Sequence, residues 1–236
     1  MSLPVFVHPG PFAGTVTLDG PEGRHAVAVK RIAVGERIML IDGRGTRAIV
    51  TVTATTGKSE LVGIVDEVGS DKPPSPAVTI VQALPKAERS ELAIDLATQA
   101  GADAIVPWQA QRCVAKWADK KQQKWEAAAL AAAKQSRRTR IPEIHPVVST
   151  RELAELVRGK TAYVLHEEAA TPLRDVDLSA EEIILIVGPE GGIGEEELAQ
   201  LAESGVRSVK LGPEVLRTAS AAMVALSAIG ALTSRW

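Results

Sequence analysis

The pattern of apolar and polar residues changes near residue 70. Before that point the two kinds alternate, most clearly in residues 35–56, where two alternating runs flank Asp42-Gly43-Arg44-Gly45. A period of two predicts strands that are buried on one face, and the glycines between the runs predict a turn. Residues 59–68 supply a further strand. We therefore expect the first part of the chain to be all-β.

Residues 69–76, GSDKPPSP, interrupt this pattern with three prolines and a glycine in eight positions. Such a stretch fits neither the interior of a helix nor a central strand. We therefore place a domain boundary there, which divides the chain into residues 1–72 and 73–236.

The second part alternates strands with helices. Residues 77–84 form a continuous apolar run, as expected for a strand that is covered on both faces. Residues 86–101 predict a helix that ends at Gly101, a typical C-terminal cap. Four further strands are expected at 102–108, 161–168, 181–188 and 206–212, and three further helices at 115–136, 195–204 and 218–232. This order predicts an α/β domain with a largely parallel sheet and helices on its faces.

Two of these strands run into similar turns. Residues 183–192 read IILIVGPEGG, and residues 209–218 read VKLGPEVLRT. Both turns should lie at the carboxyl edge of the sheet, where ligands of open α/β folds bind, and side by side if their strands are neighbours. The alternative is a pair of ordinary tight turns followed by acidic helix caps.

The first turn matches neither of the common phosphate-binding loops. It lacks the third glycine of G-x-G-x-x-G, where Glu197 stands, and it has no G-K-[ST]. A helix N-terminus attracts anions, but here Glu195, Glu196 and Glu197 already occupy it. A neutral or cationic ligand held by backbone groups is therefore favoured. S-adenosylmethionine meets this description, because it carries a sulfonium and no phosphate.

Charge and composition narrow the choice of partners. The net charge is −2, yet residues 73–140 hold 11 basic and 6 acidic residues, a local excess that attracts anions. The single cysteine, Cys113, excludes an intrachain disulfide and is expected to be a buried apolar residue. Four scattered histidines show no metal-ligand spacing, and no apolar run is long enough for a membrane span. We expect a soluble cytoplasmic protein without metal.

Residues 186–198 followed by 211–232 resemble the ribosomal RNA small subunit methyltransferase E family of the SPOUT superfamily. Residues 24–45, 84–113 and 132–144 resemble other parts of it, so the resemblance spans nearly the whole chain. It implies a knotted SPOUT α/β domain that binds the cofactor and dimerises, preceded by a PUA-like β-barrel that binds RNA. It also implies S-adenosylmethionine-dependent methylation of N3 of one uridine in 16S rRNA, near the decoding site of the assembled small subunit, by a homodimer.

Carried over by position, the resemblance implies a cofactor site built from three segments. These residues are Leu165, His166, Gly188, Pro189, Glu190, Gly191, Gly192, Leu211, Gly212, Leu216, Arg217, Thr218 and Ala219. Arg217 is our candidate for stabilising negative charge on the uracil, with capping of loop carbonyls or pairing with Glu190 as the alternative. His166 and Glu190 are both candidates for the base.

The chain departs from the family's last motif at three positions. Glu214 stands where arginine is common, and Ala219 and Ser220 stand where Glu-Thr is common, while Arg217 and Thr218 are retained. The cofactor site is therefore expected to persist, whereas a catalytic role of the replaced side chains does not carry over.

RNA contacts are expected from basic side chains that meet phosphates. The candidates are Arg24, Lys30, Arg31, Lys86, Arg89, Arg112, Arg137, Arg138 and Arg140. Residues 135–140, QSRRTR, place three of these arginines on a short connection, whereas the lysines of residues 116–124 fit a solvated helix face. Aromatic residues make up only 3% of the chain, so recognition by shape and backbone is favoured over base stacking.

The last expected helix, residues 218–232, is almost wholly small and apolar. This composition indicates burial on both sides, by the sheet and by a second subunit, with a core helix of a monomer as the alternative. Two other functions compete with uridine N3 methylation. One is methylation of a ribose 2′-hydroxyl or another base, and the other is a non-catalytic RNA-binding protein of ribosome assembly.

Overall fold

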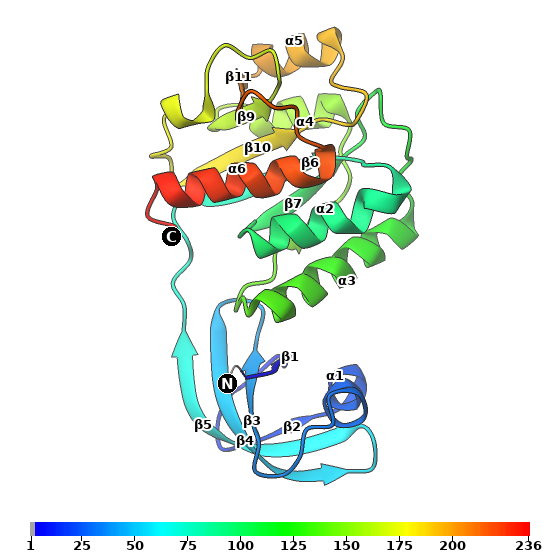
Figure 1. Cartoon of the computed structure of the whole chain (residues 1–236), viewed down its shortest axis with the longest axis vertical. Helices are drawn as coiled ribbons and strands as arrows, with labels where there is room; N and C mark the ends of the chain where they lie inside the picture. The colour runs from blue at the N-terminus through cyan, green and yellow to red at the C-terminus, as the bar shows by residue number, and fades with distance from the viewer. Residues whose placement is uncertain (1–2) are drawn as a thin grey trace. The chain divides into compact units, whose positions relative to one another are not determined.

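The computed structural model describes residues 3–236, which form two compact units (Figure 1). The first contains residues 3–73 and 133–141, and the second contains residues 74–132 and 142–236. The predicted boundary at residue 72 places residues 133–141 in the second domain. In the structure they belong to the first unit.

The first unit is built on a five-stranded sheet with the order β1-β3-β4-β5-β2. The strands are β1 (Val5–Val7), β2 (Thr15–Leu18), β3 (Arg37–Ile41), β4 (Thr46–Thr56) and β5 (Glu60–Ser70). As predicted, a turn at residues 42–45 joins β3 and β4. The Asp42 carboxylate accepts the Arg44 and Thr46 backbone N–H groups there, at 2.7 and 2.9 Å. Alternate residues of the sheet, such as Ile38, Leu40 and Val50, form the core.

The first unit also contains two helical turns that the alternation did not predict. They are α1 (Gly20–Arg24) and the π-helical turn η1 (His25–Val29), each only five residues long. In α1, the Glu22 carboxylate accepts the Val7 N–H at 2.9 Å and Lys134 Nζ at 2.6 and 2.9 Å. This partly buried cluster ties residues 133–141 to the sheet of the first unit.

The second unit contains a six-stranded sheet with the order β11-β9-β10-β6-β7-β8, whose strands pair in parallel. The strands are β6 (Ala77–Ala83), β7 (Ala104–Trp108), β8 (Glu143–Ile144), β9 (Ala162–Leu165), β10 (Glu182–Val187) and β11 (Arg207–Val209). The predicted strands are therefore present in a parallel α/β domain. The two-residue strand β8 was not predicted, because it is too short to leave a pattern.

The helices of the second sheet are α2 (Ala87–Gln99), α3 (Asp119–Ser136), α4 (Thr150–Val157), α5 (Glu195–Glu203) and α6 (Thr218–Leu232), with a short turn η2 (Leu173–Asp175). Gly101 follows α2 with φ +105°, as its role as a C-terminal cap requires. The helix α4 was not predicted. It begins at a capping box in which Ser149 and Glu152 accept each other's backbone N–H.

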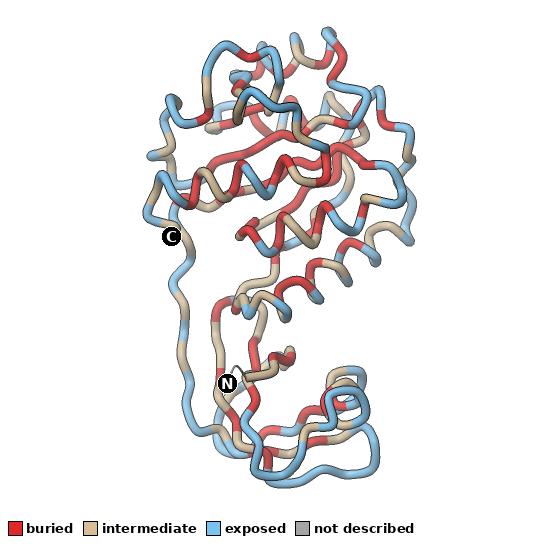
Figure 2. Tube along the Cα trace, in the orientation of Figure 1, coloured by how far each residue is buried: buried red, intermediate tan, exposed pale blue. Residues whose placement is uncertain are grey.

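The central strands are buried on both sides of the sheet (Figure 2). Five successive residues of β10, from Ile183 to Val187, are buried. Helix α6 packs on α2 and on β6 and β10, which buries Ala222, Ala225 and Ile229. Its other side leaves Met223, Val224 and Leu232 exposed in the single chain. The expected coverage of that side by a second subunit stays a prediction, as do the knot and the closed barrel.

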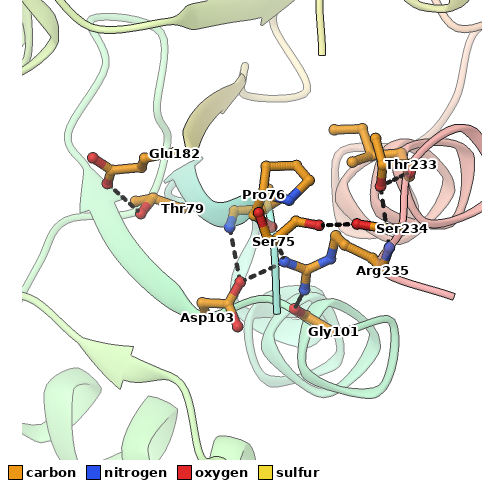
Figure 3. A network of polar contacts seen from close by, with 11 residues as sticks. Ser75, Pro76, Thr79, Gly101, Asp103, Glu182, Thr233, Ser234 and Arg235 are labelled. Carbon is orange, nitrogen blue, oxygen red and sulfur yellow. Dashed lines mark hydrogen bonds and ion pairs between the residues drawn. The ribbon is translucent and has the colours of Figure 1, made fainter. Parts of the chain in front are cut away.

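The C-terminal residues fasten α6 to the start of β6 (Figure 3). The Arg235 guanidinium pairs with the Asp103 carboxylate at 2.8 Å and donates to the Pro76 and Gly101 carbonyls. Asp103 in turn accepts the Val78 N–H at 2.8 Å. The Arg235 side chain is only 4% exposed, so this ion pair is shielded from solvent.

We expect Arg235→Ala to lower the free energy of unfolding by about 3 kcal/mol, because it leaves the largely buried Asp103 carboxylate without its cation. Urea unfolding measures this change. Arg158→Ala is the matched control. It removes an exposed pair with Glu155 and should change the free energy by less than about 0.5 kcal/mol. Equal effects of the two substitutions would contradict the importance assigned to the C-terminal network.

Candidate functional site

A cavity of about 680 Å³ opens at the carboxyl ends of β9, β10 and β11. Two loops form most of it: the glycine loop, residues 188–194 after β10, and the second loop, residues 210–217 after β11. The strands of the two loops are not neighbours, because β9 lies between β10 and β11. The loops nevertheless line one cavity together, with Leu165 and His166 at the end of β9 between them.

The structure brings twelve of the thirteen cofactor candidates to this cavity. Its lining includes Leu165, His166, Gly188, Pro189, Glu190, Gly191, Gly192, Leu211, Gly212, Leu216, Arg217 and Thr218. Ala219 is the exception, because it is 2% exposed and packs in the core at the start of α6.

Sequence reasoning did not assign every lining residue. Arg89 and Arg112, which we considered as RNA contacts, also line the cavity. The others are Glu167, Glu168, Val187, Ile193, Glu195, Leu198, Lys210, Glu214, Val215 and Ala221. Half of these directly adjoin a cofactor candidate along the chain, and that proximity was the available signal.

The glycine loop needs its glycines for its own packing. A Cβ at Gly188 would lie 2.7 Å from Ile193 Cγ1, and one at Gly191 would lie 3.3 Å from Arg112 Cβ. Gly192 adopts φ +73°, which side chains disfavour, and its N–H donates to the Pro189 carbonyl at 2.9 Å. The sequence suggested that these glycines admit a ligand; the structure shows that they admit neighbouring side chains as well.

Two side chains anchor the middle of the glycine loop. Glu190 Oε1 accepts the backbone N–H of Lys86, at the N-terminus of α2, at 3.1 Å. The helix dipole favours a carboxylate at that place. Arg112 Nη1 donates to the Gly191 carbonyl at 3.2 Å. Glu190 therefore already has a structural use, which weakens its candidacy as the base.

The three glutamates after the glycine loop do not act alike. Glu195 lines the cavity, and Glu196 is exposed outside it. Glu197 is 6% exposed, and its carboxylate accepts hydrogen bonds from Gly194, Gln111 and Thr150. Glu197 meets the expectation of negative charge at the helix mouth, because its carboxylate accepts the N–H of the N-cap residue Gly194, and it also joins two other segments to that end of the helix.

The side chains around the cavity carry both signs of charge. Its lining includes the carboxylates of Glu167, Glu168, Glu190, Glu195 and Glu214 and the cations of Arg89, Arg112, Lys210 and Arg217. S-adenosylmethionine also carries both signs, on a sulfonium, an ammonium and a carboxylate. Backbone N–H and C=O groups of Gly212 and Leu216 have no hydrogen-bond partner among residues 3–236 and remain available to a ligand. The mixed charge of the lining thus matches that of this zwitterion.

Arg217 stands where the second loop enters α6. Its carbonyl begins the helix by accepting the Ser220 and Ala221 N–H groups at 2.9 and 3.0 Å. Within residues 3–236 its guanidinium makes neither a hydrogen bond nor an ion pair, so the alternative pairing with Glu190 is not formed. The side chain is exposed at a residue that lines the cavity.

His166 is held by its surroundings. Its backbone N–H donates to the Val209 carbonyl at 2.9 Å, and its Nδ1 accepts the Glu168 N–H at 3.3 Å. His166 Nδ1 is therefore already used within this turn, which weakens its candidacy as the base.

The RNA candidates fall in both units. Arg24, Lys30 and Arg31 are exposed on and after α1 and η1. Lys86 is exposed at the start of α2. In the first unit, Arg137 is exposed with φ +59° and Arg138 is half-buried.

Arg140 differs from the other RNA candidates. Its guanidinium donates to the Asp71 carbonyl at 2.9 Å, next to the Thr139 hydroxyl bonded to the Asp71 carboxylate. Arg140 therefore supports the fold of the first unit, and its neighbour Arg137 is the more accessible cation.

Three expectations about chemistry elsewhere in the chain concern cysteine, metals and membranes. Burial raises the pKa of the Cys113 thiol, as suits an apolar core position. Over residues 3–236, no group of three His, Cys, Asp or Glu side chains is placed to hold a metal ion. The helices described in that range are all too short or too polar to cross a membrane.

Comparison with known proteins gives consistent matches. Residues 72–230 match the family model of an RNA methyltransferase domain, and residues 18–65 match that of an RNA methyltransferase PUA domain. Ribosomal RNA small subunit methyltransferase E of Mycobacterium bovis is 50% identical over 96% of this chain and 90% of its own length. The protein of the same name from Bacillus subtilis is 29% identical over 92% of this chain and 90% of its own length.

Solved structures resemble the whole chain. Ribosomal RNA small subunit methyltransferase E of Neisseria gonorrhoeae, bound to S-adenosylmethionine, superposes with a TM-score of 0.90 at 27% identity and covers 98% of both chains. A Legionella pneumophila methyltransferase in complex with the same cofactor gives a TM-score of 0.89 at 27% identity, again over 98% of both chains. With its two family domains, its cavity between two glycine–proline loops and these relatives, the chain belongs to the ribosomal RNA small subunit methyltransferase E family.

Proposed function

We propose that this protein transfers a methyl group from S-adenosylmethionine to N3 of a uridine in 16S rRNA, on the assembled small ribosomal subunit in the cytoplasm. The observation that carries the proposal is the cavity formed by the glycine loop and the second loop. Its volume lies within the range of roughly 300–1,000 Å³ that is usual for small-molecule sites. Relatives with the same fold were crystallised with S-adenosylmethionine.

The proposed cofactor site uses backbone groups more than side chains. Gly188, Gly191 and Gly192 bring main chain to one side of the cavity, and Leu211, Gly212 and Leu216 bring it to the other. When bound, S-adenosylmethionine would supply an electrophilic methyl group on its sulfonium. The chain's own contribution is to hold the uracil in line with that methyl group, and such positioning lowers a barrier by about 7–11 kcal/mol.

The uracil must lose its N3 proton before or during methyl transfer. A cation beside a uracil oxygen stabilises the resulting anion and therefore favours the loss of the proton. We assign this role to Arg217, whose exposed guanidinium is permanently charged and is not used by the fold within residues 3–236. Neither His166 nor Glu190 is assigned as a base, because His166 Nδ1 already accepts the Glu168 N–H and the Glu190 carboxylate already accepts the Lys86 N–H.

The proposal includes a basic surface for RNA and a second subunit. The exposed cations Arg24, Lys30, Arg31, Lys86 and Arg137 support phosphate contacts, together with Arg89, Arg112 and Arg138. The exposed apolar residues Met223, Val224 and Leu232 on α6 support a homodimer. Light scattering of the purified protein would test the homodimer, and a monomer at micromolar concentration would contradict it.

The function is tested with small subunits from a strain that lacks this protein. Incubation with the protein and S-adenosylmethionine should produce 3-methyluridine, identified by nucleoside analysis of the 16S rRNA. A 2′-O-methylated or other product would contradict the N3 assignment but leave the enzyme class intact. The absence of any methylated nucleoside would favour the non-catalytic alternative, which the departures at Glu214, Ala219 and Ser220 bring into consideration.

Gly188→Ala should weaken S-adenosylmethionine binding by about tenfold, because the new methyl group meets Ile193 Cγ1 at 2.7 Å and must displace the glycine loop. Isothermal titration calorimetry measures the affinity, and circular dichroism checks that the variant is folded. Unchanged affinity in the folded variant would show that the shape of the glycine loop does not govern binding.

Arg217→Ala should abolish turnover while it leaves the affinity for S-adenosylmethionine within about tenfold, because the arginine acts on the uracil rather than on the cofactor. Single-turnover methylation and calorimetry separate the two quantities. A variant that methylates at the normal rate would refute the assignment of Arg217.

RNA binding should weaken steeply with added salt, because phosphate contacts release counterions. Arg137→Ala should reduce the slope of log affinity against log salt concentration by about 1, as expected for one lost phosphate contact. Filter binding of 16S rRNA at salt concentrations from roughly 50 to 200 mM measures the slope. Lys120→Ala, on the solvated face of α3, is the control and should leave the slope unchanged. A flat salt response of the unmodified protein would contradict the phosphate contacts altogether.

A further inference from the structure

Glu197 is a buried carboxylate just outside the cavity. It is the third residue of α5 and is 6% exposed, although the two glutamates before it are exposed. Its Oε1 accepts the Gln111 backbone N–H at 3.0 Å and the Thr150 hydroxyl at 2.6 Å, and its Oε2 accepts the Gly194 N–H at 3.3 Å. The charge is thus stabilised by three donors rather than by solvent.

The three donors come from separate segments of the chain. Gly194 ends the glycine loop, Gln111 follows β7, and Thr150 begins α4. Arg112, the residue next to Gln111, donates from Nη1 to the Gly191 carbonyl at 3.2 Å. A Cβ on Gly194 would lie 3.0 Å from Gln111 Oε1, so these two segments are in close contact. Glu197 therefore fixes the end of the glycine loop directly and its middle through Gln111 and Arg112.

We propose that Glu197 is a positioning residue for the cofactor, holding residues 191–194 in the shape that lines the cavity. The inference rests on the proposed function, because it assigns the cavity to S-adenosylmethionine. Glu197 itself is absent from the lining of the cavity described for residues 3–236, so it acts through Gly194 and Arg112.

A carboxylate suits this place better than an amide. Both oxygens of a carboxylate accept hydrogen bonds, whereas a glutamine offers one acceptor oxygen and one NH2 donor. The glutamine oxygen can keep the shorter contacts with Gln111 and Thr150, and its NH2 then faces the Gly194 N–H. Two donors cannot bond, so the end of the glycine loop is released while the rest of the network remains.

The test compares Glu197→Gln with Glu196→Gln by calorimetry with S-adenosylmethionine. Both substitutions remove one negative charge from the first turn of α5, but Glu196 is exposed and has no role in the cavity. Glu197→Gln should weaken binding by about tenfold, as expected for a lost charge-assisted hydrogen bond, and Glu196→Gln by less than about twofold. In steady-state methylation the loss should appear in KM for the cofactor, with kcat retained at saturation.

Thr150→Val separates a positioning role from a purely structural one. It removes one donor to Glu197 and the acceptor of Trp108 Nε1, but it leaves the Gly194 bond intact. We expect a lower melting temperature and an affinity for S-adenosylmethionine within about twofold of the unmodified protein. If affinity and melting temperature instead fall together in Thr150→Val and Glu197→Gln, Glu197 only stabilises the fold.

The outcomes distinguish the inference from the proposed function. Failure of the unmodified protein to bind S-adenosylmethionine contradicts the function itself. Normal affinity of the unmodified protein together with normal affinity of Glu197→Gln contradicts only the role of Glu197.

Discussion

The cavity depends on an irregular loop that is held by side chains rather than by a regular backbone ladder. Residues 188–194 leave β10 without entering a helix until Glu195, so their backbone groups need other partners. The Glu197 carboxylate accepts the Gly194 N–H, and Arg112 donates to the Gly191 carbonyl. The Glu190 side chain ties the loop to α2 by accepting the Lys86 N–H. Glu190 and Glu197 thus have a physical role in and beside a loop that resembles a phosphate cradle. They hold the glycine loop in shape, and the cavity that the loop lines suits a ligand without phosphate.

The parallel sheet determines where this loop can act. Strands β9, β10 and β11 run in one direction, so their carboxyl ends deliver Leu165, the glycine loop and the second loop to the same edge. Strands β9 and β10 are buried along most of their length, whereas β11 buries only Val209, so the core anchors this edge mainly through β9 and β10. Arg89 and Arg112 add positive charge to the lining of the same cavity, which suits the proposed approach of an anionic RNA.

Much of this architecture could be predicted from the sequence, because strand and helix periodicities differ and glycine and proline mark the ends. Helix 218–232 and the turn at residues 42–45 are examples. The order of strands could not be predicted, since periodicity carries no information on which strands pair. We therefore did not foresee that β9 separates β10 from β11. The five-residue turns α1 and η1 are too short to show a helical period.

The roles of individual charged residues were the least predictable part. Glu197 follows two exposed glutamates in a first helical turn, where an acidic residue is usually a solvated cap, and only the fold reveals its burial. Arg140 lies in a run of arginines that indicated RNA binding, yet its guanidinium bonds to Asp71. Both cases depend on contacts between segments far apart in the sequence, which a local pattern does not contain.

A crystal structure of the protein grown with S-adenosylmethionine tests the central claim most directly. Our account predicts electron density for the cofactor between residues 188–194 and 211–218, with its polar atoms within hydrogen-bond distance of backbone groups of both loops. Density for the cofactor elsewhere, or an empty cavity in crystals saturated with it, would contradict the account.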